Sequence, residues 1–396
     1  MNDKHIYASI NKLVDYIENE NFKGYDPYDT LNSWIPFNWL GRWGEVLAIQ
    51  FQKINPINIR PLIGVKKNTS TKGAGLLLLG MINLYRKTHN EHLLQQIENL
   101  KNWIISNQQV FQENYCWGYD YNYTTRGERV KKGFPTVVHH SYILKALFDY
   151  YIFVNKDDEI LSLLKNGSKF ILNSIPMQHH KEGISFGYNP KATNCCINAS
   201  LHAAQCLAYE FYFTGEKKLF EIIVEAVNFV VAMQKGDGVW SYSFSFNDNE
   251  IIENERIQID FHQGFVLESI YEIKKMINYT QESWEDAIKK GLIFYKNNQF
   301  YKNGSSLWRI PRVFPVDIHN QSQGIITFSL LKNYDTKYLD FAYTIANWTI
   351  ENMQDVKGYF YYRKFKNYTN KISYMRWSQA WMLLALSSLV VERKSN

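Results

Sequence analysis

The sequence predicts an all-α fold, an (α/α)6 toroid of six helical hairpins, and three observations support this prediction. A two-helix pattern recurs along the 396 residues with a period near 58 to 64 residues. The first helix of each repeat ends in a Gln, and a glycine- and aromatic-rich turn generally follows. A second, more apolar helix then begins, and its starting positions align as His140, Asn198, His262, His319 and Trp377. Because a two-helix repeat cannot bury its apolar face alone, the copies must stack or close into a ring.

Helical periodicity gives the elements in order. An extra helix is expected at 7–19, followed by a first hairpin with its outer helix at 39–53 and its inner helix at 72–86. The other outer helices are predicted at 91–107, 158–174, 216–233, 280–298 and 336–353. Their inner partners are predicted at 139–154, 194–213, 261–277, 318–332 and 375–392. We therefore expect one domain over 1–396, with an N-terminal extension at 1–35 and six hairpins over 36–396.

Composition narrows the class of protein. The chain has 28 Tyr, 24 Phe and 11 Trp with 21% charged residues, which is typical of a globular protein and compatible with an aromatic-lined cavity. A net charge of +6, without a Lys/Arg block, is too weak and too dispersed to indicate nucleic-acid binding. It suits an anionic small substrate, or it is ordinary scatter. No apolar run reaches the length of a signal peptide or a membrane span, so a cytoplasmic protein is expected.

Three long turns, at 115–136, 241–260 and 301–317, all lie between an outer helix and the next inner helix. They should share one rim of the ring, where function is expected. On the inner helix at 194–213, polar side chains recur three or four residues apart. The first members of this stripe are Asn194, Asn198 and His202. Since an unpaired buried amide is unfavourable by about 1–3 kcal/mol, the stripe indicates a hydrated lumen or contacts between helices.

Two D-x-H sequences occupy the same position in successive repeats, each at the start of an inner helix. They are Asp260 with His262 and Asp317 with His319. A carboxylate and an imidazole at the mouth of a cavity can share general acid and base catalysis, so these four residues are the candidate catalytic set. Either Asp alone would equally serve as an ordinary helix cap.

The candidate substrate-binding residues are polar or aromatic and lie near the same rim. Arginine can bind a carboxylate or phosphate through two hydrogen bonds, and aromatic faces can stack on sugar rings. The set comprises Asp120, Tyr121, Arg126, His139, His140, Asn194, Asn198, His202, Trp240, Arg309, Arg376, Trp377 and Gln379. No metal-ligand spacing and no cofactor motif stands out, so neither a metal nor a cofactor is expected.

The opening at 24–33, G-Y-D-P-Y-D-T-L-N-S, the ending at 374–381, Y-M-R-W-S-Q-A-W, and the repeated hairpins resemble six-hairpin glycosidase-like toroid proteins found with bacterial capsule and exopolysaccharide synthesis genes. The last repeats look similar to the C-terminal toroids of glucuronyl epimerases. The resemblance implies a saccharide substrate and one of three activities: hydrolysis by carboxylates, elimination at uronic acids by Tyr, His, Asn and Arg, or epimerisation of uronic acids. No catalytic motif of a single activity transfers onto this chain.

Two other classes of function remain open from the sequence. The chain could be a non-catalytic glycan-binding or scaffold protein of a polysaccharide biosynthesis complex, with partners in that complex. Repeats such as Gln234-x-x-x-Gly238-x-Trp240 also resemble terpene cyclases and prenyltransferases. Those enzymes need an acidic cluster, which here is approached only by Asp157-Asp158, and an apolar lumen, which the polar stripe contradicts.

Overall fold

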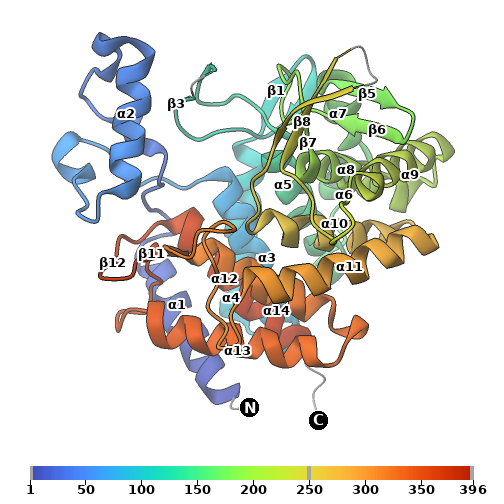
Figure 1. The fold of residues 1–396 in the computed structure, drawn as a ribbon. Helices are drawn as coiled ribbons and strands as arrows, with labels where there is room; N and C mark the ends of the chain where they lie inside the picture. Colours follow the sequence, from blue (N-terminus) through green and yellow to red (C-terminus); the bar gives the residue numbers. More distant parts are fainter. Residues whose placement is uncertain (1–2, 126, 248–250, 393–396) are drawn as a thin grey trace.

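The computed structural model describes residues 3–125, 127–247 and 251–392. The fold is mostly helical and confirms the predicted toroid (Figure 1). The inner helices are α3 (Thr71–Thr88), α5 (Val137–Phe153), α8 (Ile197–Thr214), α10 (His262–Met276), α12 (Ile318–Leu330) and α14 (Trp381–Glu392), the last preceded by the π-helix η5 (Met375–Ala380). The outer helices are α4 (Glu91–Ser106), α6 (Asp158–Lys165) with α7 (Ser168–Ser174), α9 (Lys217–Ala232), α11 (Glu282–Gln299), α13 (Lys337–Met353) and α1 (Asp3–Asn19).

The inner helices form the core because they are buried nearly all round. Every residue of α12 from Ile318 to Ser329 is buried, including its polar side chains. Several of these helices begin at a capping side chain. Thr136 accepts a hydrogen bond from the N–H of His139 at the start of α5, and Asp317 accepts one from His319 at the start of α12.

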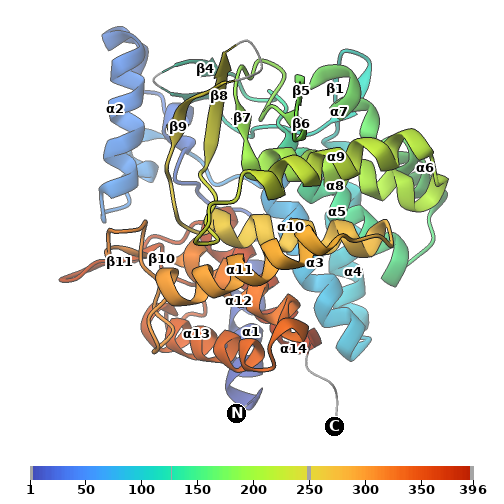
Figure 2. The same cartoon turned by 45° about the vertical axis from the view of Figure 1, so that its right-hand side comes forward.

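Short antiparallel strands occupy the turns between outer and inner helices. They are β1 (Gln109–Phe111), β2 (Asn114–Cys116), β3 (Tyr123–Thr124), β4 (Arg129–Val130), β5 (Met177–His180), β6 (Gly183–Phe186), β7 (Cys195–Cys196), β8 (Ser243–Asn247), β9 (Ile251–Arg256), β10 (Val316–Asp317), β11 (Arg363–Lys364) and β12 (Thr369–Asn370). Pairs form between β1 and β2, β3 and β4, and β5 and β6, with three-stranded sheets β7-β8-β9 and β10-β11-β12. Most of these strands lie above the ring in Figure 2, on the side opposite the chain ends.

The repeated Gln and Gly of the sequence have a structural explanation. At the end of α9, Gln234 Nε2 donates to Gly238 O at 3.0 Å and to Ala287 O of α11 at 2.9 Å. Gly238 has a positive φ of 93°, and a Cβ there would lie 2.5 Å from Lys290 O. Here the motif therefore fastens the turn to the next outer helix, and a side chain larger than Gly does not fit at position 238.

The same motif shows that α1 closes the ring, so the predicted first hairpin is wrong. Gln354 Nε2, at the end of α13, donates to Ser9 O of α1 at 3.1 Å. A Cβ at Gly358 would lie 2.1 Å from Lys12 O. Helix α1, which we expected to be an extension, therefore occupies the sixth outer position and contacts α13 and α14.

Helix α2 (Gly41–Ile54), the predicted outer partner of α3, instead stands away from the ring (Figure 1). It contacts the 3-10 helices η1 (Asp29–Asn32) and η2 (Phe37–Leu40) and strand β3, and η3 (Arg60–Ile63) follows it. The amphipathic pattern that suggested a ring helix is real, but its apolar face is exposed. The remaining 3-10 helix, η4 (Lys332–Tyr334), joins α12 to α13. Among the described residues, no helix is long and apolar enough to cross a membrane.

Candidate functional site

Each inner helix contributes a side chain from its N-terminal half to one cluster at the centre of the ring. The Nζ of Lys72 lies 4.5 Å from the ring centre of Tyr142, whose ring lies 5.2 Å from that of His202. The ring of His319 lies 4.5 Å from Trp381, and Phe265 lies 6.0 Å from His202 and 5.7 Å from His319. We call this set the lumen cluster: Lys72, Tyr142, His202, Phe265, His319 and Trp381.

His319, a predicted catalytic residue, is the most unusual member. Its side chain is 3% exposed, yet neither Nδ1 nor Nε2 has a hydrogen-bond partner in the described part of the chain. Its ring stacks on Phe261 at 4.1 Å and meets Trp377 edge-on at 4.7 Å. Burial, together with the charge of Lys72, holds the pKa of His319 well below its usual value, so the imidazole is neutral. The ring therefore has one donor and one acceptor nitrogen whose hydrogen-bonding capacity is unused among the described residues.

Asp260 and His262, also predicted as catalytic, form a carboxylate–imidazole pair. Asp260 Oδ1 lies 2.5 Å from His262 Nδ1 and also accepts the backbone N–H of His262 at 3.2 Å. Burial raises the pKa of Asp260, but His262 and Arg309 outweigh this and leave it below its usual value. The ionised carboxylate thus accepts a hydrogen bond from Nδ1–H, which places the lone pair of His262 on Nε2, where it can act as a base. The His262 side chain is 15% exposed, on the rim side of the cluster.

Asp317 is placed differently from Asp260. Its Oδ2 accepts from Arg363 Nε at 2.6 Å, and its Oδ1 accepts from Trp377 Nε1 at 3.0 Å and from the N–H of His319 at 3.0 Å. The carboxylate caps α12 and fixes the tryptophan beside His319. Asp317 thus positions the imidazole. Both of its oxygens accept hydrogen bonds from protein groups, whereas a general acid would direct a protonated oxygen at the substrate.

Lys72 was not among the predicted site residues. Its side chain is buried and forms no hydrogen bond or ion pair with a described residue, and its Nζ lies over Tyr142 and Trp381. Burial, and next the charge of Arg376, push its pKa well below the usual value. The available signal was one lysine at the start of an otherwise apolar run at 71–84.

Two further predicted histidines, His202 of α8 and His139 of α5, are each held through Nδ1 by a neighbouring side chain. His202 Nδ1 lies 2.8 Å from Gln205 Oε1, and its Nε2 is buried without a partner. His139 Nδ1 lies 2.7 Å from Thr136 Oγ1, and its ring lies 4.9 Å from Tyr119. Burial lowers the pKa of both, that of His202 to about 3. Both imidazoles are therefore neutral; His202 belongs to the lumen cluster, and His139 lies outside it beside Tyr119.

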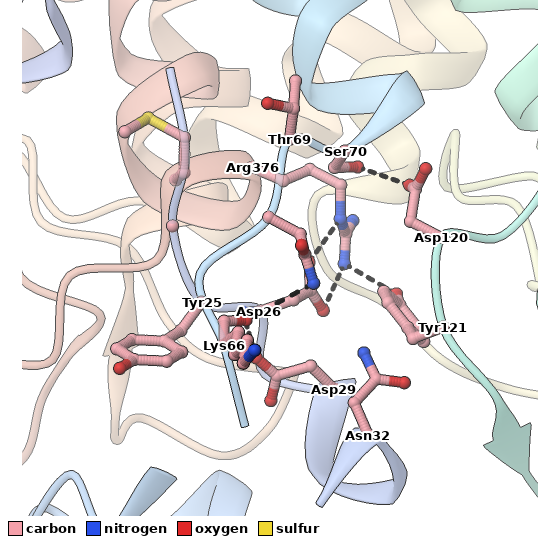
Figure 3. A pocket seen from close by; sticks show the side chains of 13 residues that line it. Tyr25, Asp26, Asp29, Asn32, Lys66, Thr69, Ser70, Asp120, Tyr121 and Arg376 are labelled. Atoms are coloured by element: carbon pink, nitrogen blue, oxygen red, sulfur yellow. Dashed lines mark hydrogen bonds and ion pairs between the residues drawn. The ribbon is translucent and has the colours of Figure 1, made fainter. Parts of the chain in front are cut away.

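Arg376, predicted to bind an anionic substrate, is already paired. Its Nε and Nη2 donate to the two carboxylate oxygens of Asp26 at 2.6 and 2.9 Å, and Nη2 also donates to the hydroxyl of Tyr121 at 3.2 Å (Figure 3). Asp120 accepts from Ser70 Oγ at 2.8 Å, and burial raises its pKa to about 6. The pocket between these groups has a volume of about 20 Å³, which is space for about one water molecule.

Several predicted binding residues lie outside the cluster. His140 Nε2 donates to Gly167 O at 2.8 Å between the inner and outer layers, and Trp240 Nε1 donates to Val230 O at 2.8 Å. Gln379 bonds to both the N–H and the C=O of Phe360 in its turn. These three residues hold the framework together.

The remaining predicted residues lie near the rim. Asn198 accepts a hydrogen bond from Cys196 Sγ at 3.1 Å, while the Asn194 side chain forms none within the described residues. Arg309, 41% exposed, donates to Asp260 Oδ2 at 3.2 Å. Arg126 lies outside the described residues. Partly exposed aromatic rings also lie here, among them Tyr28, which is 5.7 Å from Trp377, and Tyr242, which is 4.7 Å from His262.

No group of three or more His, Cys, Asp or Glu side chains could hold a metal ion within residues 3–125, 127–247 and 251–392. The groups of the lumen cluster that can take part in chemistry are its two imidazoles, one amine and its aromatic rings. A buried neutral imidazole with free nitrogens can accept or donate a proton, and aromatic faces can hold a sugar ring.

Comparison with known proteins identifies the fold. No protein-family model matches the sequence, and a search of curated proteins found no significant match. Among solved structures, cellobiose 2-epimerase from Bacillus thermoamylovorans is similar over 97% of this chain and 99% of its own, with 13% identity and a TM-score of 0.65. A family 76 glycoside hydrolase from a bovine Bacteroides thetaiotaomicron strain matches over 98% and 77%, with 12% identity and a TM-score of 0.65. A D-mannose isomerase matches over 81% and 87%, with 12% identity and a TM-score of 0.59. The chain therefore has the six-hairpin glycosidase-like α/α toroid fold that these structures share.

Proposed function

We propose that this protein is a carbohydrate-active enzyme that moves a proton at a carbon of a saccharide, as in epimerisation, isomerisation or elimination. The observation that supports this most directly is His319, a buried neutral imidazole whose two nitrogens have no partner among the described residues. Polar atoms in protein interiors are nearly always paired, so an unpaired imidazole at the centre of the ring is best explained by a bound ligand.

The pairing of the aspartates favours imidazole chemistry over hydrolysis by two carboxylates. A glycoside hydrolase needs one carboxylic acid of raised pKa and a second carboxylate facing it. Here Asp260 binds His262 and Arg309, and Asp317 binds Arg363 and Trp377. In this proposal both aspartates position the groups beside them.

The steps then assign a role to each group. His262 Nε2, set up by Asp260, removes a proton from a carbon next to the carbonyl or carboxylate of the sugar. Lys72 donates a hydrogen bond to the oxygen on which negative charge develops. The proton that His262 then carries goes back to carbon or to the leaving oxygen, while the neutral imidazole of His319, on the other side of Phe261, donates a hydrogen bond from its N–H to an oxygen of the sugar.

Similarity of fold to a cellobiose 2-epimerase and a D-mannose isomerase supports a saccharide as the substrate class. The sequence resemblance also predicts a sugar from surface-polysaccharide synthesis and partners in a biosynthesis complex. The sequence pattern predicts a cytoplasmic location. These three points stay predictions. The non-catalytic glycan-binding alternative predicts binding without turnover.

The proposal is tested by incubating the protein with neutral hexoses, N-acetylhexosamines, uronic acids and β-1,4-linked disaccharides, and analysing the products by NMR. We expect one class of sugar to be converted, and His262→Asn and His319→Asn to lower the rate by about 10²- to 10⁴-fold. His92→Asn, an exposed histidine paired with Glu18, is the matched control and should retain full activity. Conversion that survives both substitutions in the cluster would contradict the proposal.

A further inference from the structure

The ring holds a second, larger cavity at its other end, away from the lumen cluster. Its volume is about 280 Å³, and all six inner helices line it through residues of their later turns. Examples are Asn83 of α3, Asp149 of α5 and Tyr209 of α8. The lumen cluster comes from the earlier turns of the same helices, so the two sites lie at opposite ends of the ring.

Carboxylates outnumber cations in the deep part of this cavity. Lys145 Nζ donates to Glu268 Oε1 at 2.7 Å and to Glu272 Oε1 at 2.6 Å, so one ammonium serves two carboxylates. The other oxygen of each carboxylate accepts one hydrogen bond from a neutral amide, that of Gln323 for Glu268 and that of Gln205 for Glu272. Asp149, one turn beyond Lys145 on α5, adds a third carboxylate and forms no hydrogen bond or ion pair with any described residue. Burial raises the pKa of Asp149 to about 6, although Lys145 and Arg86 act in the opposite direction, and burial raises the pKa of Glu272 as well.

A tyrosine hydroxyl also faces this cavity. The Tyr209 side chain is 2% exposed and lines the cavity, yet its hydroxyl has no hydrogen-bond partner in the described part of the chain. The aromatic rings of Phe148 and Tyr271 line the same space. Carboxylates combined with aromatic faces are the surroundings that organic ammonium groups prefer.

The other two cations of the cavity already lie against aromatic rings. The guanidinium of Arg86 lies 3.7 Å from the ring centre of Phe153. Lys275 is exposed, with its Nζ 5.1 Å from the ring of Tyr271. Neither forms an ion pair with Asp149 or Glu272.

We propose that this cavity binds an organic amine, with the ammonium held by Asp149 and Glu272 and within reach of the Tyr209 hydroxyl. The site is separate from the lumen cluster and does not depend on the proposed sugar chemistry.

Calorimetric titration with 1,4-diaminobutane tests this, with 1,4-butanediol and succinate as neutral and anionic probes of similar length. We expect saturable binding of the diamine alone. Asp149→Asn and Tyr209→Phe should weaken it, the first at least about tenfold because a hydrogen bond to a charged group is lost. Asp158→Asn, an exposed carboxylate on α6, is the control and should bind as the unchanged protein does. Absence of diamine binding, equal binding of the diol or succinate, or unchanged affinity in Asp149→Asn would overturn the proposal.

A different observation, the exposed face of α2, supports a second inference. Five apolar side chains, one in η2 and four in α2, follow one another three or four residues apart and are 56–85% exposed. They are Trp39, Trp43, Leu47, Phe51 and Ile54. Trp34, Leu40, Ile57 and Leu62, in the flanking segments, are 68–79% exposed. We call these nine residues the α2 surface.

The α2 surface is larger than the apolar patch of an ordinary monomer. Nine large apolar side chains that are more than half exposed present on the order of 1,000 Å², against about 300–600 Å² for the largest patch of a typical monomer. A stable protein interface needs about 800 Å² per partner. The exposed area is therefore sufficient for a stable dimer.

The charges of α2 favour another protein surface over a membrane. Arg42 donates to Gly127 O at 3.1 Å, Glu45 pairs with Arg129 at 2.8 Å, and Lys53 lies over the ring of Tyr28. Both cations of the helix thus already contact groups of this chain, whereas surface-binding helices commonly present several free lysines and arginines to anionic lipid. We infer that a second copy of this chain covers the α2 surface, by packing α2 against α2 about a two-fold axis.

Sedimentation equilibrium tests this inference. We expect twice the 46.8 kDa mass of the chain for the unchanged protein and the mass of one chain for Leu47→Glu. Val356→Glu, which changes an isolated apolar residue that is 90% exposed, is the control and should remain a dimer. A monomeric unchanged protein, a dimeric Leu47→Glu, or binding of the unchanged protein to phosphatidylglycerol vesicles would overturn the inference.

Discussion

His319 occupies a position where packing alone would favour an apolar side chain. Its ring is enclosed by Phe261, Phe265, Trp377 and Trp381, and neither nitrogen has a partner among the described residues. An unpaired buried polar group lowers stability by about 1–3 kcal/mol. Such a residue is retained at a stability cost when function needs it.

His319→Leu should therefore increase the free energy of unfolding by about 1 kcal/mol while abolishing turnover, because it removes the unpaired nitrogens and keeps the ring cavity filled. Urea denaturation followed by circular dichroism measures the first effect, and the sugar assay measures the second. A loss of stability of more than about 2 kcal/mol would show that the imidazole is structural.

His140 gives a pH prediction that does not involve the site. Burial lowers its pKa from 6.5 to about 4, so between these values the unfolded chain binds a proton that the folded chain does not. The free energy of unfolding should therefore fall as the pH falls through 6.5 toward 4. His140→Gln should make the pH slope between 5 and 6 shallower by about 1.4 kcal/mol per unit. Equal slopes in urea titrations of the two proteins would refute this.

Sequence reasoning found part of the site. The three- and four-residue spacing on one apolar helix identified His202, and the two D-x-H sequences identified the Asp260–His262 pair. The sequence alone could not show that Arg363 binds Asp317. The two residues are 46 positions apart and meet only because strands β10 and β11 pair. Lys72 was missed because a single lysine at a helix start usually lies in solvent.

Among the elements, the inner helices and most outer helices were predicted to within a few residues, because their apolar patterns are long and regular. The first hairpin was not. Helix α2 has the same amphipathic pattern as a ring helix, and it is the contacts of Gln354 with Ser9 and of Gly358 with Lys12 that show α1 in its place. Sequence periodicity identifies an apolar face but not the surface that covers it.

The role of α1 is tested by Gly358→Ala, since a Cβ there would lie 2.1 Å from Lys12 O. The matched control is Gly133→Ala, since Gly133 has a φ of 88° against 100° for Gly358, and the nearest atom to its Cβ would be an ordinary 3.6 Å away, in the Gln109 side chain. The control should lose about 1 kcal/mol from backbone strain alone. Gly358→Ala should lose about 2 kcal/mol more from overpacking, and α1 should become more sensitive to protease. Equal losses would mean that α1 does not depend on this contact.

In the whole molecule, ring closure brings the two ends of the chain together, since α1 packs against α13 and α14. Both ends lie at the same side of the ring in Figure 1. Every hairpin then contacts two neighbours, unlike the open stack of a solenoid, whose end repeats have only one.

A closed ring should unfold as one cooperative unit. We expect urea unfolding curves from tryptophan fluorescence and circular dichroism to coincide, and removal of residues 1–19 to lower the midpoint measured by both. Curves that separate in the unchanged protein would indicate that the hairpins unfold independently.

The most direct test of the central claim is deuterium incorporation from D2O into a sugar that the protein converts, followed by proton NMR. Imidazole-mediated proton transfer predicts loss of one carbon-bound proton signal next to the carbonyl or carboxylate, at a rate that His262→Asn and His319→Asn each lower by about 10²- to 10⁴-fold. Conversion of the sugar with no deuterium on carbon, as in simple hydrolysis, would contradict the account.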